Sequence, residues 1–319
     1  MRAARILFGL VLATVTARGA QAYDRVVLVG WDGADYRRVS QLLSEGRLPN
    51  LAQVTAFGTF QQLTIEEDTG TKPSWTTQLT GLPMVIHGTT RNRHYTDAPP
   101  GRTVFEVLHA NGLQSSYVAG KCVRTEPGGR PTNRGNMCLG IDPQGKPYPF
   151  LRVPDVAVLA VADKHFTMAE ATDHCLEGLA AVGATGFAFC HYQWPDFVGH
   201  HFGGKSAEYD QALIDLDTEL GRIAAAAGIG SDVGTLLLLS SDHGFEQAGD
   251  PEESNIHPNP ARTKRQFGFA HQWQPRAILG SNTLLRSPAT GRDMFKTILD
   301  ALGRLDLANA PDGRSLLVH

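Results

Sequence analysis

The sequence has 319 residues, of which 42% are hydrophobic and 19% charged, and this balance excludes an intrinsically disordered chain. The formal net charge of −3 predicts no basic surface for binding a nucleic acid. The length suits one large domain or two smaller ones.

The first 22 residues differ from the rest of the chain. Two arginines lie among the first five residues, residues 6–17 form a short apolar run, and an Ala-Gln-Ala triplet occupies residues 20–22. Small residues at this spacing suit a signal peptidase. We therefore predict a signal peptide over residues 1–22 and a single domain over residues 23–319 of a secreted or periplasmic protein. No later apolar run is long enough to span a bilayer, so no membrane span is expected after removal of the signal.

Predicted strands and helices alternate along the rest of the chain. Each strand is a short apolar run, and each helix has apolar residues at helical spacing or a helix-start signal. The strands are expected at residues 25–30, 58–65, 116–119, 185–191, 235–240 and 276–279, and the helices near residues 36–45, 73–79, 103–110, 167–181, 206–226 and 292–301. Residues 125–150 and 246–266 are rich in proline or polar residues and are predicted loops. The alternation predicts an α/β fold, a three-layer αβα sandwich with a mostly parallel central sheet.

Four cysteines in a chain that is expected to be exported indicate disulfide bonds. Cys122 and Cys138 flank a stretch rich in glycine, proline and asparagine. We therefore expect the pairs Cys122–Cys138 and Cys175–Cys190. None of the cysteines has the CxxC spacing of a structural zinc site.

Aspartate and histidine residues lie next to several predicted strands, where active sites of open α/β sheets gather. They are Asp32 after the first strand, Asp196 and His200 after residues 185–191, Asp242 and His243 after residues 235–240, and His271 before the last strand. Mixed aspartate and histidine ligands suit zinc or a similar transition metal better than calcium or magnesium. Other interpretations are open: Asp32 is equally suited to cap a helix, His201 could replace its neighbour, and His257 could replace His271.

A threonine precedes the helix expected at residues 73–79, in the segment Thr71-Lys72-Pro73. Proline is typical of a first helical turn, where the backbone N–H groups and the macrodipole favour anionic oxygens. A threonine hydroxyl there, next to a metal ion, would be an activated nucleophile. The alternatives are that Thr71 only caps the helix, or that Thr69 or Thr76 is the reactive hydroxyl.

Taken together, these residues resemble the alkaline phosphatase superfamily and are most similar to its nucleotide pyrophosphatase/phosphodiesterase branch. The motifs of that branch are matched by Thr71-Lys72-Pro73 with Thr80-Gly81, His87-Gly88 with Asn92, Asp196-Phe197-Val198-Gly199-His200, Asp242-His243-Gly244, and His271 before a proline-led apolar strand. The motifs come in the family's order from Asp32 to His271 and cover most of the chain. The segment at Thr71 is also similar to the sulfatase motif Cys-x-Pro-Ser-Arg, but the cysteine and the arginine are replaced by Thr71 and Trp75, so sulfatase activity is not expected as the main task.

The resemblance implies an alkaline phosphatase-like catalytic domain with two divalent metal ions, expected to be zinc. One ion would be held by Asp196, His200 and His271, and the other by Asp32, Thr71, Asp242 and His243. This selects His200 over His201. Thr71 would be the covalent nucleophile, and Asn92 would contact a phosphoryl oxygen.

The predicted function is an exported phosphodiesterase or nucleotide pyrophosphatase, acting on a small-molecule phosphate ester through a phosphothreonine at Thr71. The alternative is a phosphomonoesterase, with Lys121, Arg124, Arg91 or Arg93 meeting the extra phosphate charge. The intact ligand set disfavours a catalytically silent binding protein, and a cofactor-independent mutase would need a large inserted domain. Lys121 is similar to a sulfatase lysine that contacts the anionic group, so it is a candidate substrate contact or else a solvated surface lysine.

Overall fold

The computed structural model describes residues 23–67, 69–90, 102–118, 120, 157–158, 167–231, 234–245, 273–310 and 312–319. The predicted signal peptide and both predicted loops lie outside these residues. The prediction of a single domain stays a prediction.

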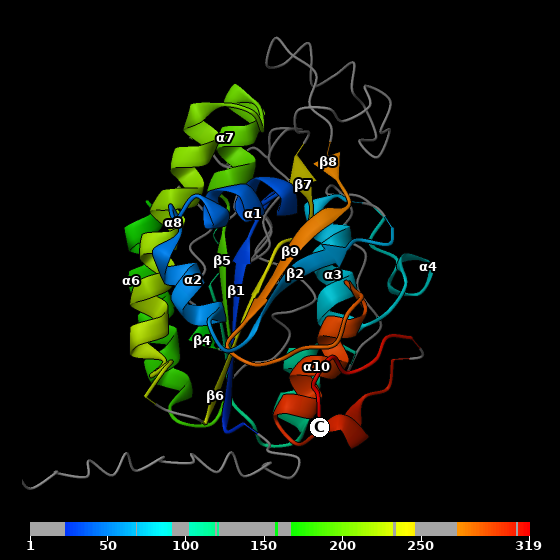
Figure 1. Cartoon of the computed structure of the whole chain (residues 1–319). Coiled ribbons are helices and arrows are strands. Elements are labelled where there is room, and N and C mark those ends of the chain that lie inside the picture. The colour runs from blue at the N-terminus through cyan, green and yellow to red at the C-terminus, as the bar shows by residue number, and fades with distance from the viewer. Residues whose placement is uncertain are drawn as a thin grey trace, which may run out of the picture.

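A central eight-stranded sheet has the order β10-β2-β9-β6-β1-β5-β3-β4 (Figure 1). Its strands are β1 (Arg25–Trp31), β2 (Thr59–Thr64), β3 (Ser115–Val118), β4 (Ala157–Val158), β5 (Gly186–Tyr192), β6 (Thr235–Ser240), β9 (Arg276–Ser281) and β10 (Ala289–Thr290). Neighbouring strands are parallel, except that β9 is antiparallel to both β2 and β6. A separate antiparallel pair joins β7 (Gly244–Phe245) to β8 (Trp273–Gln274).

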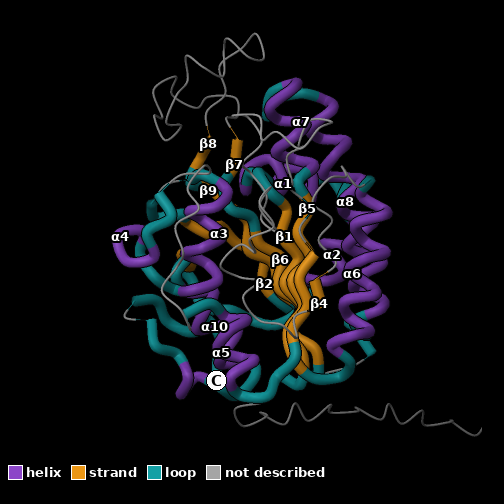
Figure 2. Tube along the Cα trace, turned by 180° about the vertical axis from the view of Figure 1, so that it is seen from behind, coloured by secondary structure: helices purple, strands orange, loops and turns teal. Residues whose placement is uncertain are grey.

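Helices cover both faces of the sheet (Figure 2). One face carries α1 (Tyr36–Ser44), α2 (Pro49–Thr55), α6 (Met168–Val182) and α8 (Ala207–Ala226), and the other carries α3 (Thr71–Thr80), α5 (Val104–Ala110) and α10 (Asp293–Ala301). The remaining described helices are α4 (Met84–His87), α7 (Trp194–Phe202) and the 3-10 turn Leu305–Leu307. The predicted fold class, an α/β sandwich around a mostly parallel sheet, is therefore confirmed.

The apolar side chains of strand β1 pack into two hydrophobic cores, one on each face of the sheet. Side chains alternate across a strand, so Val26 and Leu28 join the hydrophobic cluster under α3, α5 and α10. Val27 and Val29 join the cluster under α1, α2, α6 and α8. Both faces of the strand are buried, which explains why its sequence is continuously apolar.

The helices differ from the predicted ones in two respects. Helix α3 begins at Thr71, two residues before the expected start, with Gly70 as its N-cap residue. Helices α2, α4 and α7 were not predicted at all. Among the described residues, no helix is long and apolar enough to cross a membrane.

A disulfide bond joins Cys175 of α6 to Cys190 of β5, with the two Cα atoms 5.6 Å apart. This confirms one of the two expected pairs. The other, Cys122–Cys138, lies outside the described residues. The bond ties a helix to a strand that ends at the candidate site.

Candidate active site

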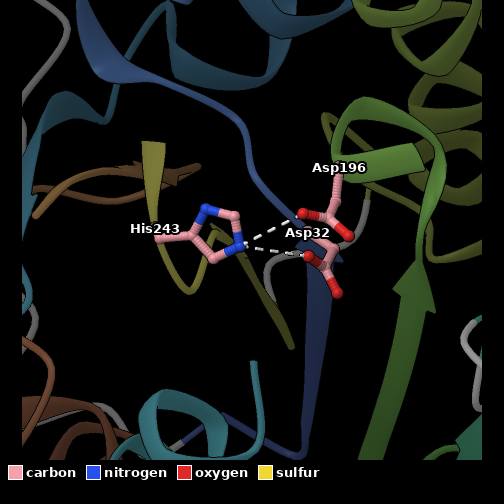
Figure 3. A group of neighbouring side chains, drawn as sticks. All are labelled: Asp32, Asp196 and His243. Atoms are coloured by element: carbon pink, nitrogen blue, oxygen red, sulfur yellow. Dashed lines mark ion pairs between the residues drawn. The ribbon is translucent and has the colours of Figure 1, made fainter. Parts of the chain in front are cut away.

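Three buried side chains from distant parts of the chain converge at the carboxyl ends of β1, β5 and β6 (Figure 3). One ligand atom from each of Asp32, Asp196 and His243 lies within 4.8 Å of the other two. Nε2 of His243 lies 3.4 Å from Asp32 Oδ1 and 3.5 Å from Asp196 Oδ1. The sequence analysis predicted these residues near the ends of the strands, where the sites of open α/β sheets gather.

Backbone hydrogen bonds hold the two carboxylates side by side. The Asp32 N–H donates to the carbonyl oxygen of Tyr192 at 2.9 Å, and the Asp196 N–H donates to the carbonyl oxygen of Asp32 at 2.9 Å. The first bond extends the pairing of β1 with β5 past the end of β1, and the second ties Asp32 to helix α7. Two like charges are kept close by the main chain, which is unfavourable unless a cation compensates them.

The turn after β1 is shaped by Gly33 and Tyr209. Gly33 has φ +75°, and a Cβ atom there would lie 3.0 Å from the Asp196 Cα, so only glycine fits. The Tyr209 hydroxyl accepts from the Asp35 N–H at 3.0 Å and donates to the Gly33 carbonyl at 2.5 Å. These contacts fix the backbone that carries Asp32.

Asp242 and His243 enter from the end of β6, and both are completely buried. Asp242 Oδ1 accepts from the Gly33 N–H at 3.0 Å, while its Oδ2 lies 3.6 Å from His243 Nε2. Burial lowers the pKa of His243, but the carboxylates of Asp242, Asp32 and Asp196 outweigh this effect and raise the pKa to about 9. The cluster therefore attracts positive charge.

Asp196 and His200 come from helix α7. His200 Nε2 lies 3.2 Å from Asp196 Oδ1, as expected for two residues one helical turn apart. The neighbouring His201 is exposed, its Nδ1 lies 2.7 Å from the Phe197 carbonyl oxygen, and its ring lies 4.3 Å from that of Phe197. Of the two adjacent histidines, His200 is the one that contacts the cluster's carboxylate.

Helix α3 lies against the same edge of the sheet. Thr71 is its first residue and is only 1% exposed. Because Gly70 is the N-cap residue, Thr71 lies in the first turn and does not cap the helix. Ser74 Oγ donates to the Asp242 carbonyl at 2.8 Å, and Gln78 Nε2 donates to the Ser241 carbonyl at 3.0 Å. These bonds fix the start of α3 relative to the end of β6.

The hydroxyl of Thr76, an alternative nucleophile, is used inside the helix. It donates to the carbonyl oxygen of Lys72 at 2.6 Å. Thr69, the other alternative, is buried and lies outside α3, before its N-cap residue. Thr71 therefore remains the only one of the three in the first turn of α3, where helix N–H groups favour an anion.

The hydrogen bonds of His87 give it a structural role. Its Nδ1 accepts from the Thr89 N–H at 3.1 Å, so its Nε2 carries the proton and donates to Thr77 Oγ1 at 3.0 Å. Burial, and to a lesser extent the charge of Arg292, lowers its pKa to about 4. The ring is thus neutral and ties α4 to α3.

Sequence reasoning gave no role to two buried residues near the site. Lys72, next to Thr71, is 1% exposed, which is rare for lysine. His191, near the end of β5, is fully buried with Nε2 3.3 Å from Asp32 Oδ2. Two features of the sequence could have pointed to these residues. One is a histidine at the end of an otherwise apolar strand, and the other is a lysine beside a candidate nucleophile.

Three residues assigned from the motifs lie outside the described residues. They are Asn92, Lys121 and His271, and their roles stay predictions. The same holds for His257 and for the arginines at positions 91, 93 and 124.

The described side chains fit a divalent cation. Asp32, Asp196 and His243 offer hard oxygen and imidazole nitrogen atoms at close range, with all three residues buried. Buried carboxylates are stable when they are paired or bind a metal. Carboxylate and imidazole groups together are typical ligands of divalent transition metals.

The sequence profile of type I phosphodiesterases and nucleotide pyrophosphatases matches residues 26–265. The chain belongs to this family. The match includes Asp32, Thr71, Asp196 and His243, and it confirms the prediction of a phosphoric ester hydrolase of the alkaline phosphatase superfamily. No match was found among the curated proteins.

Solved structures share the fold of this phosphodiesterase-family chain. Murine ectonucleotide pyrophosphatase/phosphodiesterase 5 is 15% identical, with a TM-score of 0.58, covering 94% of this chain and 97% of that one. Its inactive threonine-to-alanine variant in complex with AMP is 13% identical, with a TM-score of 0.58 and the same coverage of 94% and 97%. Phosphonoacetate hydrolase from Sinorhizobium meliloti 1021, in complex with phosphonoformate, is 13% identical, with a TM-score of 0.52 and coverage of 89% and 96%.

Proposed function

We propose that this chain is an exported phosphodiesterase or nucleotide pyrophosphatase that cleaves a small-molecule phosphate ester with Thr71 as nucleophile and two zinc ions as cofactors. The observation that carries the proposal is the buried group of Asp32, Asp196 and His243 at the sheet edge against which helix α3 begins. Export is supported by the sequence of residues 1–22 and by the disulfide bond at Cys175.

The two ions divide the predicted ligands into two sets. Asp196, His200 and His271 would hold one ion, and Asp32, Thr71, Asp242 and His243 would hold the other. When bound, the ions would neutralise phosphoryl charge and favour ionisation of a hydroxyl. The family profile and the murine complex with AMP support a nucleotide-type ester as the first substrate class to test.

The residues of the chain supply the rest of the chemistry. Thr71 Oγ gives up its proton and attacks phosphorus, and a new P–O bond forms. The bond from phosphorus to the leaving oxygen of an alcohol or a phosphate breaks, and that oxygen takes up a proton. The N–H groups of the first turn of α3 and the Asn92 amide would hold a non-bridging oxygen. Water then attacks the phosphothreonine, the bond to Thr71 Oγ breaks, and the hydroxyl regains its proton. Lys121 would contact the substrate anion.

A phosphomonoesterase is the second candidate, and Lys72 favours it. A monoester dianion carries more charge than a diester, so a site for it gains from an added ammonium group. Lys72 follows the nucleophile in the first turn of α3 and is buried there, so it is the described lysine to test for this role. Comparing kcat/KM for a nitrophenyl monoester and a bis-nitrophenyl diester, in the native protein and in Lys72→Met, separates the two candidates. A selective loss of monoester cleavage supports the second.

The nucleophile is tested by Thr71→Ala and Thr71→Ser with zinc present. Thr71→Ala is expected to lose at least about 1,000-fold in kcat, the scale on which removal of a nucleophile acts, while Thr71→Ser keeps measurable turnover. Acid-quenched native protein should carry a phosphoryl group on the peptide that contains Thr71, by mass spectrometry. Thr218→Ala, an exposed change on α8, is the matched control. Near-native turnover of Thr71→Ala would overturn the assignment.

A further inference from the structure

We propose that His191 is a positioning residue that orients the carboxylate of Asp32 for metal binding and couples it to the helix of the nucleophile. This inference rests on the proposed metal role of Asp32. His191 belongs to none of the motifs that the family resemblance assigned. Its position in the fold suggests the role.

The two oxygens of Asp32 face two different imidazoles. Oδ2 lies 3.3 Å from Nε2 of His191, and Oδ1 lies 3.4 Å from Nε2 of His243. The carboxylate is therefore held from both sides. Because Oδ2 meets His191, Oδ1 is the oxygen of Asp32 that meets His243 in the group of Asp32, Asp196 and His243.

The strand register fixes this arrangement. His191 of β5 is the partner of Gly30 in β1, two residues before Asp32. Phe187, Phe189 and His191 alternate onto the same face of β5, and the first two belong to the core under α3. The third residue on this face, His191, lies at the candidate active site, and it is a histidine where the two residues before it on this face are phenylalanines.

Packing alone does not require a histidine at this place. The His191 ring lies edge-on to Trp75 at 5.5 Å and to Phe189 at 6.0 Å, as an aromatic hydrocarbon ring could. Burying an imidazole with its two polar nitrogens costs free energy that phenylalanine would not cost. The contact of Nε2 with the Asp32 carboxylate offers a reason for a histidine at this position.

The same ring contacts the nucleophile helix. Trp75 lies one turn after Thr71 in α3 and is fully buried. A Cβ atom at position 30 would lie 2.9 Å from the rings of both Trp75 and Phe189, so Gly30 is what lets the indole approach the sheet. Contacts thus run from α3 through Trp75 and His191 to Asp32, so the imidazole links the helix of the nucleophile to the proposed metal ligand.

Groups that orient a metal ligand strongly affect metal affinity, because a free carboxylate samples orientations that do not bind. Loss of such a partner typically weakens metal binding by about 10–100-fold. We expect His191→Phe, which keeps the ring packing and removes the nitrogens, to weaken zinc binding by this factor. At saturating zinc its kcat should fall by more than about tenfold, with KM within about twofold, since the proposed role is to orient a metal ligand and not to bind substrate.

The experiment measures zinc stoichiometry and affinity by competition with a chromogenic chelator, alongside kcat and KM. His174→Gln, on the outer face of α6 where the histidine contacts Glu177, is the control and should match the native protein. Circular dichroism and thermal unfolding in chelator verify folding. Zinc affinity of folded His191→Phe within twofold of the native value would overturn the proposal, and so would a native protein that binds no divalent metal.

A second pair of variants keeps the test decisive if His191→Phe does not fold. Glutamine places its amide near the Nε2 position of histidine, and asparagine places it near Nδ1. Because Asp32 faces Nε2, His191→Gln should bind zinc more tightly than His191→Asn and recover part of kcat. Equal affinity of the two would overturn the proposal. Weakened zinc binding without phosphoesterase activity in the native protein would refute the proposed function and leave the positioning role intact.

Discussion

Nε2 of His243 lies 3.4 Å from Oδ1 of Asp32, and both side chains are fully buried. A buried imidazole that faces carboxylates from β1 and α7 is a site built for positive charge, either a proton or a metal ion. The same nitrogen serves both, so proton and metal compete for it.

Asp32→Asn tests the metal role of the first carboxylate. The change keeps the shape and removes the charge, so zinc affinity should fall by more than about 100-fold, beyond the ~10–100-fold typical when only a ligand's hydrogen-bond partner is lost. Phosphoesterase activity at limiting zinc should fall in parallel. Asp215→Asn on the exposed face of α8 is the matched control. Unchanged zinc affinity in folded Asp32→Asn would remove this residue from the ligand set.

The metal-free protein should lose stability at alkaline pH. The pKa of His243 is raised from 6.5 to about 9, so its contribution is fully present below pH 6.5 and is lost as the pH rises through 9. The free energy of unfolding in chelator, measured between pH 6.5 and 9.5, should decline. In His243→Gln this decline should be smaller. If the free energy of unfolding declined equally with pH in the native protein and in His243→Gln, His243 would not carry the expected charge.

His87 should make the protein less stable at acidic pH, the opposite of the effect expected from His243. Its pKa is lowered from 6.5 to about 4, so its contribution is present above pH 6.5 and is lost as the pH falls towards 4. Protonation would remove the acceptor for the Thr89 N–H. The native protein should lose on the order of 3 kcal/mol over this range through His87, and His87→Gln should show a flatter profile. Denaturant unfolding at several pH values measures the difference.

Replacement of Asp217 should lower the stability of the protein without affecting the candidate active site. Helix α2 has no side-chain cap of its own. Instead, Asp217 of α8 accepts from the Leu51 N–H at 2.8 Å and the Asn50 N–H at 3.0 Å. Asp217→Ala should cost about 1–3 kcal/mol because buried N–H groups lose their acceptor. Zinc affinity should not change, and a coupled loss would show that the site depends on α2.

Some elements could be predicted because local sequence decides them. Strand β6 has the predicted bounds, since a continuous apolar run suits a strand buried on both faces. Helix α7 could not be predicted, because Pro195 and Gly199 look like helix breakers. In the structure Pro195 lies in the first turn, where no N–H is needed. Gly199 lies where a Cβ atom would be 2.8 Å from the Phe245 ring.

The sequence by itself determined the α/β alternation, the order of the motif residues and the family, because apolar periodicity and motif spacing are local properties of the chain. Tertiary structure alone decided which of these residues meet. It brought Asp32, Asp196 and His243 within 4.8 Å, made Gly70 rather than Thr71 the cap of α3, and buried Lys72 and His191 beside the site. The physical reason is that strand register and helix packing set distances and burial, and charge and metal affinity follow from them.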